Sequence, residues 1–171
     1  LAGPGVISDR AVPSLHDLAV SAGIGVLNTW GAKGVFDWRS QHHLATIGLQ
    51  ADDFELSGLG DADLIVATGL DRAESPEERW RLAPALTVPP AGLAPLAERC
   101  GPSRPRPLAM PPLRARLAAV TQRGWSVEAS PLPPSRATMH YAECVAAGAL
   151  VAADAGNGGF WVARTLGTTR L

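Results

Sequence analysis

Two short apolar runs, each ending in small or turn-forming residues, limit what this chain can fold into more than any other feature. They are residues 24–29 and residues 62–69, and such runs are typical of strands that are buried on both faces of a parallel sheet. A helix is expected just before the first run, because Pro13 suits a first helical position and Gly23 can adopt the left-handed conformation that ends a helix. This alternation of strand and helix predicts an α/β protein with βαβ units.

The length and charge of the chain exclude several classes of protein. At 171 residues it has room for one domain, or for one domain and a fragment of a second. Its 15 basic and 16 acidic residues leave no basic excess for nucleic acid or an anionic membrane, and no apolar run approaches the roughly 20 residues that a membrane span needs. The two cysteines form no CxxC motif, so we expect neither a disulfide framework nor a zinc site, and a cytoplasmic location.

The second half of the chain is less regular. Nine of the 15 prolines fall in residues 84–112, which predicts an extended connector with at most a weak strand at residues 85–88. Helices are predicted at residues 113–123 and from about 136 to 147, the latter with Ser135 as its N-cap. A strand is predicted at residues 149–153, followed by a glycine-rich turn and a further helix.

Two glycine-rich turns are candidate ligand sites. Gly3-Pro4-Gly5 stands between a strand end and a helix, where backbone N–H groups can face a phosphate. No third glycine follows at the fingerprint spacing, so a tight turn that only the fold requires is favoured. In residues 154–161 a strand ends in an acid and a glycine-rich turn begins a helix, whose N-terminus favours an anion. A β-to-α turn capped by Asp154 and Asn157 is an equally open alternative.

The remaining polar residues predict no catalytic or metal site. His42 and His43 diverge on regular structure, and no other ligand stands at a metal-binding spacing. The acid pairs Asp52-Asp53 and Glu77-Glu78 are predicted to be solvated charges. The chain contains no GxSxG, GxxxxGK[ST] or HExxH motif, so no catalytic residue is predicted.

Four segments, taken in order and spacing, resemble one family. Residues 1–6, 29–36, 47–48 and 62–69 are similar to the central domain of thiamine-diphosphate-dependent enzymes of the acetolactate synthase, pyruvate oxidase and benzoylformate decarboxylase type. Residues 135–164 resemble the opening of that family's C-terminal diphosphate-binding domain. The resemblance implies a Rossmann-like (DHS-like) three-layer α/β domain over residues 1–130, with a parallel sheet of about six strands and a connector at about residues 84–112. Residues 131–171 would begin a truncated diphosphate-binding domain.

The resemblance also implies a cofactor and partners. Thiamine diphosphate and Mg²⁺ would bind in a full-length parent enzyme of the lyase or transferase class, with Gly156, Asn157 and Gly158 cradling the diphosphate from one side. The catalytic glutamate and the magnesium-anchoring segment of the family have no counterpart in this chain. The chain alone is therefore expected to be inactive and to hold no cofactor. Its partners would be the remaining N- and C-terminal domains of the parent, assembled as a homodimer or homotetramer.

In some members of this family the central domain also binds FAD or ADP. Gly3, Gly5 and Gly69 would then lie at the carboxyl ends of strands, where such a nucleotide sits. Two segments depart from the flavin-binding pattern of the family. Residues 49–53 lack the run that usually follows Gly48, and residues 87–90 lack the acid that usually accepts the ribose, so a central domain without FAD is favoured. The alternatives are a free-standing module that binds FAD, ADP or NAD, and a structural or oligomerisation domain.

Overall fold

The computed structural model describes residues 1–101 and 110–169, and its strands form two short parallel sheets. In one sheet β1 (Val26–Thr29) pairs with β2 (His43–Ile47), and in the other β3 (Ile65–Ala67) pairs with β4 (Ala85–Thr87). The expectation of one sheet of about six strands is therefore wrong for the described residues. After β4 the described residues form helices, and no further strands. Prolines are frequent there, and they cannot donate to a β-ladder.

The first residues of the chain lie between the two sheets. Ala2 forms parallel bridges to both Asn28 and Thr68. The N–H of Ala2 donates to the carbonyl of Leu27 at 2.9 Å, and the N–H of Gly3 donates to the carbonyl of Thr68 at 2.9 Å. Residues 1–3 thus connect β1 to β3, and the parallel order across the molecule is β2, β1, residues 1–3, β3 and β4.

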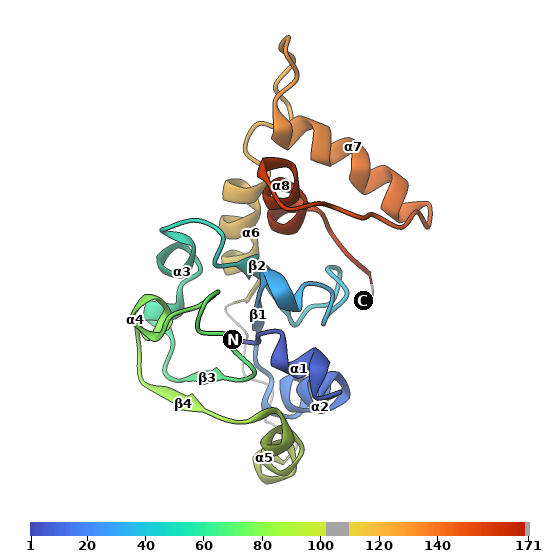
Figure 1. Ribbon diagram of the computed structural model, residues 1–171. Helices are drawn as coiled ribbons and strands as arrows, with labels where there is room; N and C mark the ends of the chain where they lie inside the picture. Colours follow the sequence, from blue (N-terminus) through green and yellow to red (C-terminus); the bar gives the residue numbers. More distant parts are fainter. Residues whose placement is uncertain (102–109, 170–171) are drawn as a thin grey trace.

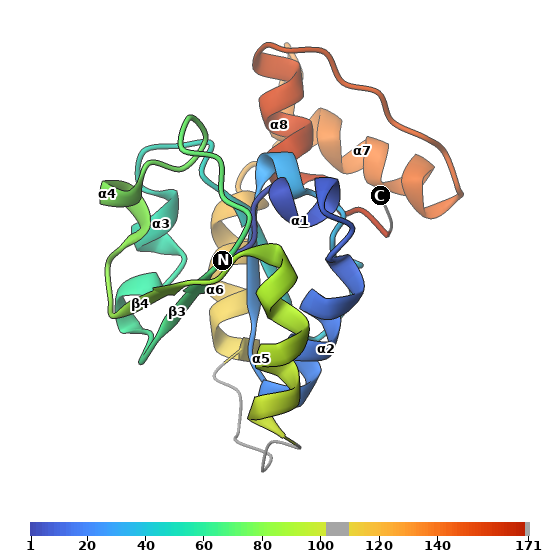
Figure 2. The same cartoon turned by 60° about the horizontal axis from the view of Figure 1, so that its bottom comes forward.

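Helices cover both sides of this arrangement. Because neighbouring residues of a strand point to opposite faces, Val26 belongs to one apolar cluster and Leu27 to the other. Three helices contribute buried residues to the cluster of Val26, and α2 and α5 lie side by side there (Figure 2). These helices are α1 (Gly5–Ser8), α2 (Val12–Ala22) and α5 (Leu93–Cys100). Three others contribute to the cluster of Leu27, and they are α3 (Asp53–Leu56), α4 (Glu77–Trp80) and α6 (Met110–Thr121).

The C-terminal part consists of two helices that pack on each other, α7 (Pro134–Ala146) and α8 (Asn157–Thr165). Figure 1 shows them in orange and red beside the upper end of α6, and α8 also contacts β2. The helices predicted before residue 24, at residues 113–123, near residue 136 and after the glycine-rich turn are confirmed. Pro13 lies in the first turn of α2, and Gly23 ends it with φ +60°.

Three local predictions are wrong. The proline-rich connector contains the helix α5 and is therefore not extended throughout. Pro95 is tolerated because it lies in the first turn, where an N–H group has no acceptor within the helix. Residues 149–153 form no strand, and Leu150 is 90% exposed because no neighbouring strand pairs with it. Ser135 is not an N-cap, since α7 already begins at Pro134. Residues 102–109 of the predicted connector lie outside the described residues.

Three short 3₁₀ turns complete the described structure: η1 (Trp30–Ala32), η2 (Leu59–Asp61) and η3 (Pro90–Gly92). Within residues 1–101 and 110–169, every helix is too short or too polar to cross a bilayer.

Candidate functional site

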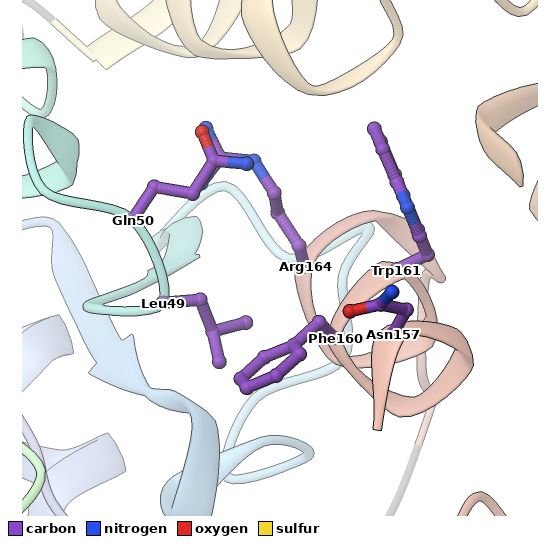
Figure 3. Close-up of a pocket in the computed structure, with 6 residues that line it drawn as sticks. All are labelled: Leu49, Gln50, Asn157, Phe160, Trp161 and Arg164. Carbon is purple, nitrogen blue, oxygen red and sulfur yellow. The ribbon is translucent and has the colours of Figure 1, made fainter. Parts of the chain in front are cut away.

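The turns that follow β1, β2 and β3 meet α8 at the carboxyl ends of these strands. A cavity of about 380 Å³ is lined there by residues that include Trp30, Gly48, Glu74 and Phe160. A second cavity, of about 220 Å³, is lined by Leu49, Gln50, Asn157, Phe160, Trp161 and Arg164 (Figure 3). In open α/β folds, ligands bind outside the carboxyl ends of the strands, so this edge is the candidate functional site.

Gly3, Gly5 and Gly69 lie in contact with one another. The N–H of Gly5 donates to the carbonyl of Gly69 at 2.9 Å. A Cβ atom on Gly5 would lie 2.8 Å from Gly69 Cα, and one on Gly69 would lie 2.6 Å from Val6 N. The absence of side chains therefore lets the turn after residues 1–3 touch the turn after β3. This packing by itself accounts for the three glycines, and their contact with a nucleotide stays a prediction.

Gly156, Asn157 and Gly158 form the start of α8, as the glycine-rich turn predicted. Gly156 has φ +136°, a conformation that favours glycine, and a Cβ atom at Gly156 or Gly158 would meet no heavy atom within 4 Å. The first N–H groups of a helix have no intrahelical acceptor and carry partial positive charge. The turn thus offers backbone donors beside open space, an arrangement that can hold an anion.

A buried ion pair connects α8 to the loop after β2. Arg164 pairs with Asp53, and their side chains are 8% and 3% exposed. The other carboxylate oxygen of Asp53 accepts the N–H groups of Leu49 and Gln50, each at 2.9 Å. The prediction that Asp53 is a solvated charge is therefore wrong, whereas its neighbour Asp52 is exposed. No helix was predicted at α3, so no local pattern in the sequence marked this role of Asp53.

Two further contacts at the strand ends were not anticipated from the sequence. The hydroxyl of Thr29 donates to Glu74 Oε2 at 2.6 Å, which joins the end of β1 to the turn after β3. The guanidinium of Arg79 donates to the carbonyl of Gln50 at 2.8 Å and lies 5.3 Å from the centre of the Phe54 ring. Both contacts fix the loops around the larger cavity.

Two charged side chains between β1 and β2 have shifted pKa values. Burial lowers the pKa of Lys33 to about 8, because desolvation disfavours its charged form. Hydrogen bonds from the side chain and backbone of Arg39 lower the pKa of Asp37 to about 2. Neither residue lines the two cavities described above.

His42 and His43 are engaged in separate contacts. His42 Nδ1 lies 2.9 Å from the carbonyl of Ile24, and His43 Nε2 lies 3.2 Å from Asn28 Oδ1. Within the described part of the chain, no three histidine, cysteine or acidic side chains are grouped so that they could hold a metal ion.

A comparison with protein families identifies the first half of the chain. The sequence model of the thiamine pyrophosphate enzyme central domain matches residues 1–86, which is 86 of the 171 residues. The chain belongs to this family. The match runs from the first residues into β4, so it includes the three interlocked glycines and Asp53. The central domain of thiamine pyrophosphate enzymes has an α/β Rossmann-like fold, so the predicted fold class is confirmed. The family resemblance inferred from the sequence is confirmed as well. No curated protein matches the chain.

Proposed function

We propose that this chain is an interior part of a thiamine-diphosphate-dependent enzyme of the decarboxylase or synthase type. Residues 1–130 would form its central scaffold domain, and residues 131–171 would begin the diphosphate-binding domain. The observation that carries this proposal is the glycine turn at the start of α8, which faces open space and lies next to a domain of the thiamine pyrophosphate enzyme family.

The turn suits a diphosphate group in its chemistry. Free N–H groups at a helix N-terminus bind phosphate oxygens, and the missing side chains at Gly156 and Gly158 leave room for a close approach. Asn157 lines the smaller cavity and can add an amide donor. Gly156, Asn157 and Gly158 would hold one side of the diphosphate and fix its orientation.

The rest of the active site would come from other parts of the parent enzyme. Bound thiamine diphosphate supplies an electron sink that stabilises a carbanion, which suits lyase or transferase reactions of the acetolactate synthase type. We propose that Mg²⁺ and the catalytic groups belong to the N- and C-terminal domains of the parent, assembled as a homodimer or homotetramer. The free and exposed thiols of Cys100 and Cys144 suit a cytoplasmic location.

We further propose that the central part holds no FAD. The end of β4 is Thr87, which is exposed and offers no carboxylate to a ribose hydroxyl. The interlocked Gly3, Gly5 and Gly69 pack against protein backbone rather than against open space. These residues therefore serve the scaffold, and Gly3, Gly5 and Gly69 would contact a nucleotide only if a ligand displaced one of the two turns.

The experiment is a titration of the ¹⁵N-labelled chain with thiamine diphosphate and MgCl₂, followed by NMR. The chain supplies only one side of the site, so it should not retain thiamine diphosphate at ordinary concentrations. At high concentration we expect weak contact, with a Kd on the order of 1 mM, and amide shifts confined to residues 156–159. Gly158→Ala should weaken this binding by about tenfold, since its Cβ would occupy the space left for the ligand. The matched control is Gly60→Ala, whose Cβ would make only an ordinary contact, 3.9 Å from Leu82.

Each outcome decides between the functions considered. Shifts at residues 156–159 that Gly158→Ala suppresses and Gly60→Ala leaves intact support the proposal. An absence of shifts there with thiamine diphosphate contradicts it. Shifts at Gly3, Gly5 and Gly69 with FAD or ADP would identify a nucleotide-binding module instead.

A further inference from the structure

We propose that Asp53 is a positioning residue for α8. Through its ion pair with Arg164, it fixes this helix, and with it the turn of Gly156, Asn157 and Gly158, against the loop after β2. The contact joins residues that are 111 positions apart in the sequence. It therefore connects the family-matched half of the chain to the C-terminal helices.

The two carboxylate oxygens of Asp53 accept hydrogen bonds from different partners. Its Oδ2 accepts the N–H groups of Leu49 and Gln50 at 2.9 Å each, which fixes the loop, and its Oδ1 accepts from Arg164. Both side chains of the pair are buried. A buried charge that loses its partner is strongly destabilising, so only a narrow range of α8 positions keeps the pair intact.

Within α8 itself apolar packing is limited, although Leu166 at its C-cap is buried. None of the residues Asn157–Thr165 is fully buried, and Phe160 is 52% exposed. Besides the ion pair, the hydroxyl of Thr165 donates to Thr138 Oγ1 at 3.0 Å, which holds α8 to α7 but not to the central domain. The ion pair is therefore the specific polar contact, among the described residues, by which α8 is held to the loop after β2.

The position of α8 decides where the glycine turn lies. Arg164 and Asn157 line the same cavity from the two ends of α8, and Figure 3 shows Arg164 next to Gln50 and Asn157 near Phe160. A displacement of the Arg164 end therefore moves the Asn157 end as well, because a short helix moves as a rigid unit. The consequence for diphosphate binding rests on the proposed function, whereas the anchoring of α8 does not.

The test compares Asp53→Asn with wild type by hydrogen–deuterium exchange. The Asn carbonyl can still accept from Leu49 and Gln50, but its NH₂ group then faces the Arg164 guanidinium, donor against donor. We expect amides of α8 to exchange at least about tenfold faster while those of α2 stay unchanged. The matched control is Asp52→Asn, which alters the exposed neighbour.

Arg164→Met and the double variant complete a thermodynamic cycle. The double variant strands no buried charge, so we expect its unfolding midpoint to recover toward wild type. Its α8 should still exchange about as fast as in either single variant, because the ion pair no longer holds the helix to the loop after β2. Wild-type exchange of α8 in Asp53→Asn or in the double variant would overturn the proposal, as would faster exchange spread equally over α2.

The same variants separate this inference from the proposed function. Thiamine diphosphate should bind Asp53→Asn about tenfold more weakly than wild type, and Asp52→Asn with unchanged affinity. If α8 loosens as expected but wild type shows no thiamine diphosphate shifts, the positioning role stands and the proposed function fails. If the shifts are present and α8 does not loosen, the positioning role fails alone.

Discussion

Replacing Gly3 by alanine should be far more damaging than its single added methyl group suggests. A Cβ atom at this position would lie 2.6 Å from Leu70 Cα and 2.8 Å from the carbonyl carbon of Gly69. Carbon atoms in contact prefer separations of about 3.5–4.0 Å, so one backbone segment must move by roughly 1 Å. Neither can do so freely, because Gly3 N–H donates to Thr68 and Gly5 N–H donates to Gly69.

This forced movement sets the expected cost. Overpacking costs about 1–3 kcal/mol and occasionally more, and backbone on both sides of the contact places Gly3→Ala at about 3 kcal/mol. For a protein of this size the free energy of unfolding falls by about 2 kcal/mol per M urea, so the urea midpoint of unfolding should fall by about 1.5 M. Gly60→Ala is the control, since its Cβ would lie 3.9 Å from Leu82 Cβ. Equal midpoints for the two variants would refute the argument.

Two shifted pKa values give further predictions. Because the pKa of Lys33 is about 8 in the folded chain and 10.5 ordinarily, the unfolded chain binds more protons between these values, and stability should rise with pH over that window. Lys33→Met should remove this part of the rise in urea midpoint, and an unchanged rise would assign it to another group. Because the pKa of Asp37 is lowered from 3.8 to about 2, its carboxylate stabilises the folded state at pH values above 3.8. This stabilisation is lost as the pH falls through about 2. Arg39→Gln should return the ¹³C NMR titration midpoint of Asp37 toward 3.8, and a midpoint that stays low would exclude the guanidinium of Arg39 as the main cause.

Local signals in the sequence were sufficient for several elements. Pro13 and Gly23 mark the two ends of α2. They could be recognised because the preference for proline in the first turn and for glycine at the C-cap depends on one helix alone. The strand β2 was missed because its residues, which include His43 and Thr46, lack a continuous apolar run. The helix α5 was hidden by surrounding prolines, although one in the first turn does not prevent a helix.

Only the part of the candidate site that a short stretch of sequence forms could be predicted. The glycine turn before α8 is visible in the sequence because three adjacent residues create it. Asp53 looked like one of two solvated acids, since its partner Arg164 lies 111 positions away and no short pattern marks the pair. The cavities arise where turns from three strands and α8 meet, which tertiary structure alone decides.

The bridging position of residues 1–3 has a consequence for the order in which the chain folds. Ala2 pairs with Asn28 on one side and Thr68 on the other, so the middle of the arrangement joins residues 1–3 to residues much later in the sequence. Closing such long loops costs chain entropy before any contact compensates for it. On a ribosome residues 1–3 would emerge before β3, yet they could not complete their pairing until Thr68 had been synthesised. Until then, residues 1–3 have no strand to pair with on the side of β3.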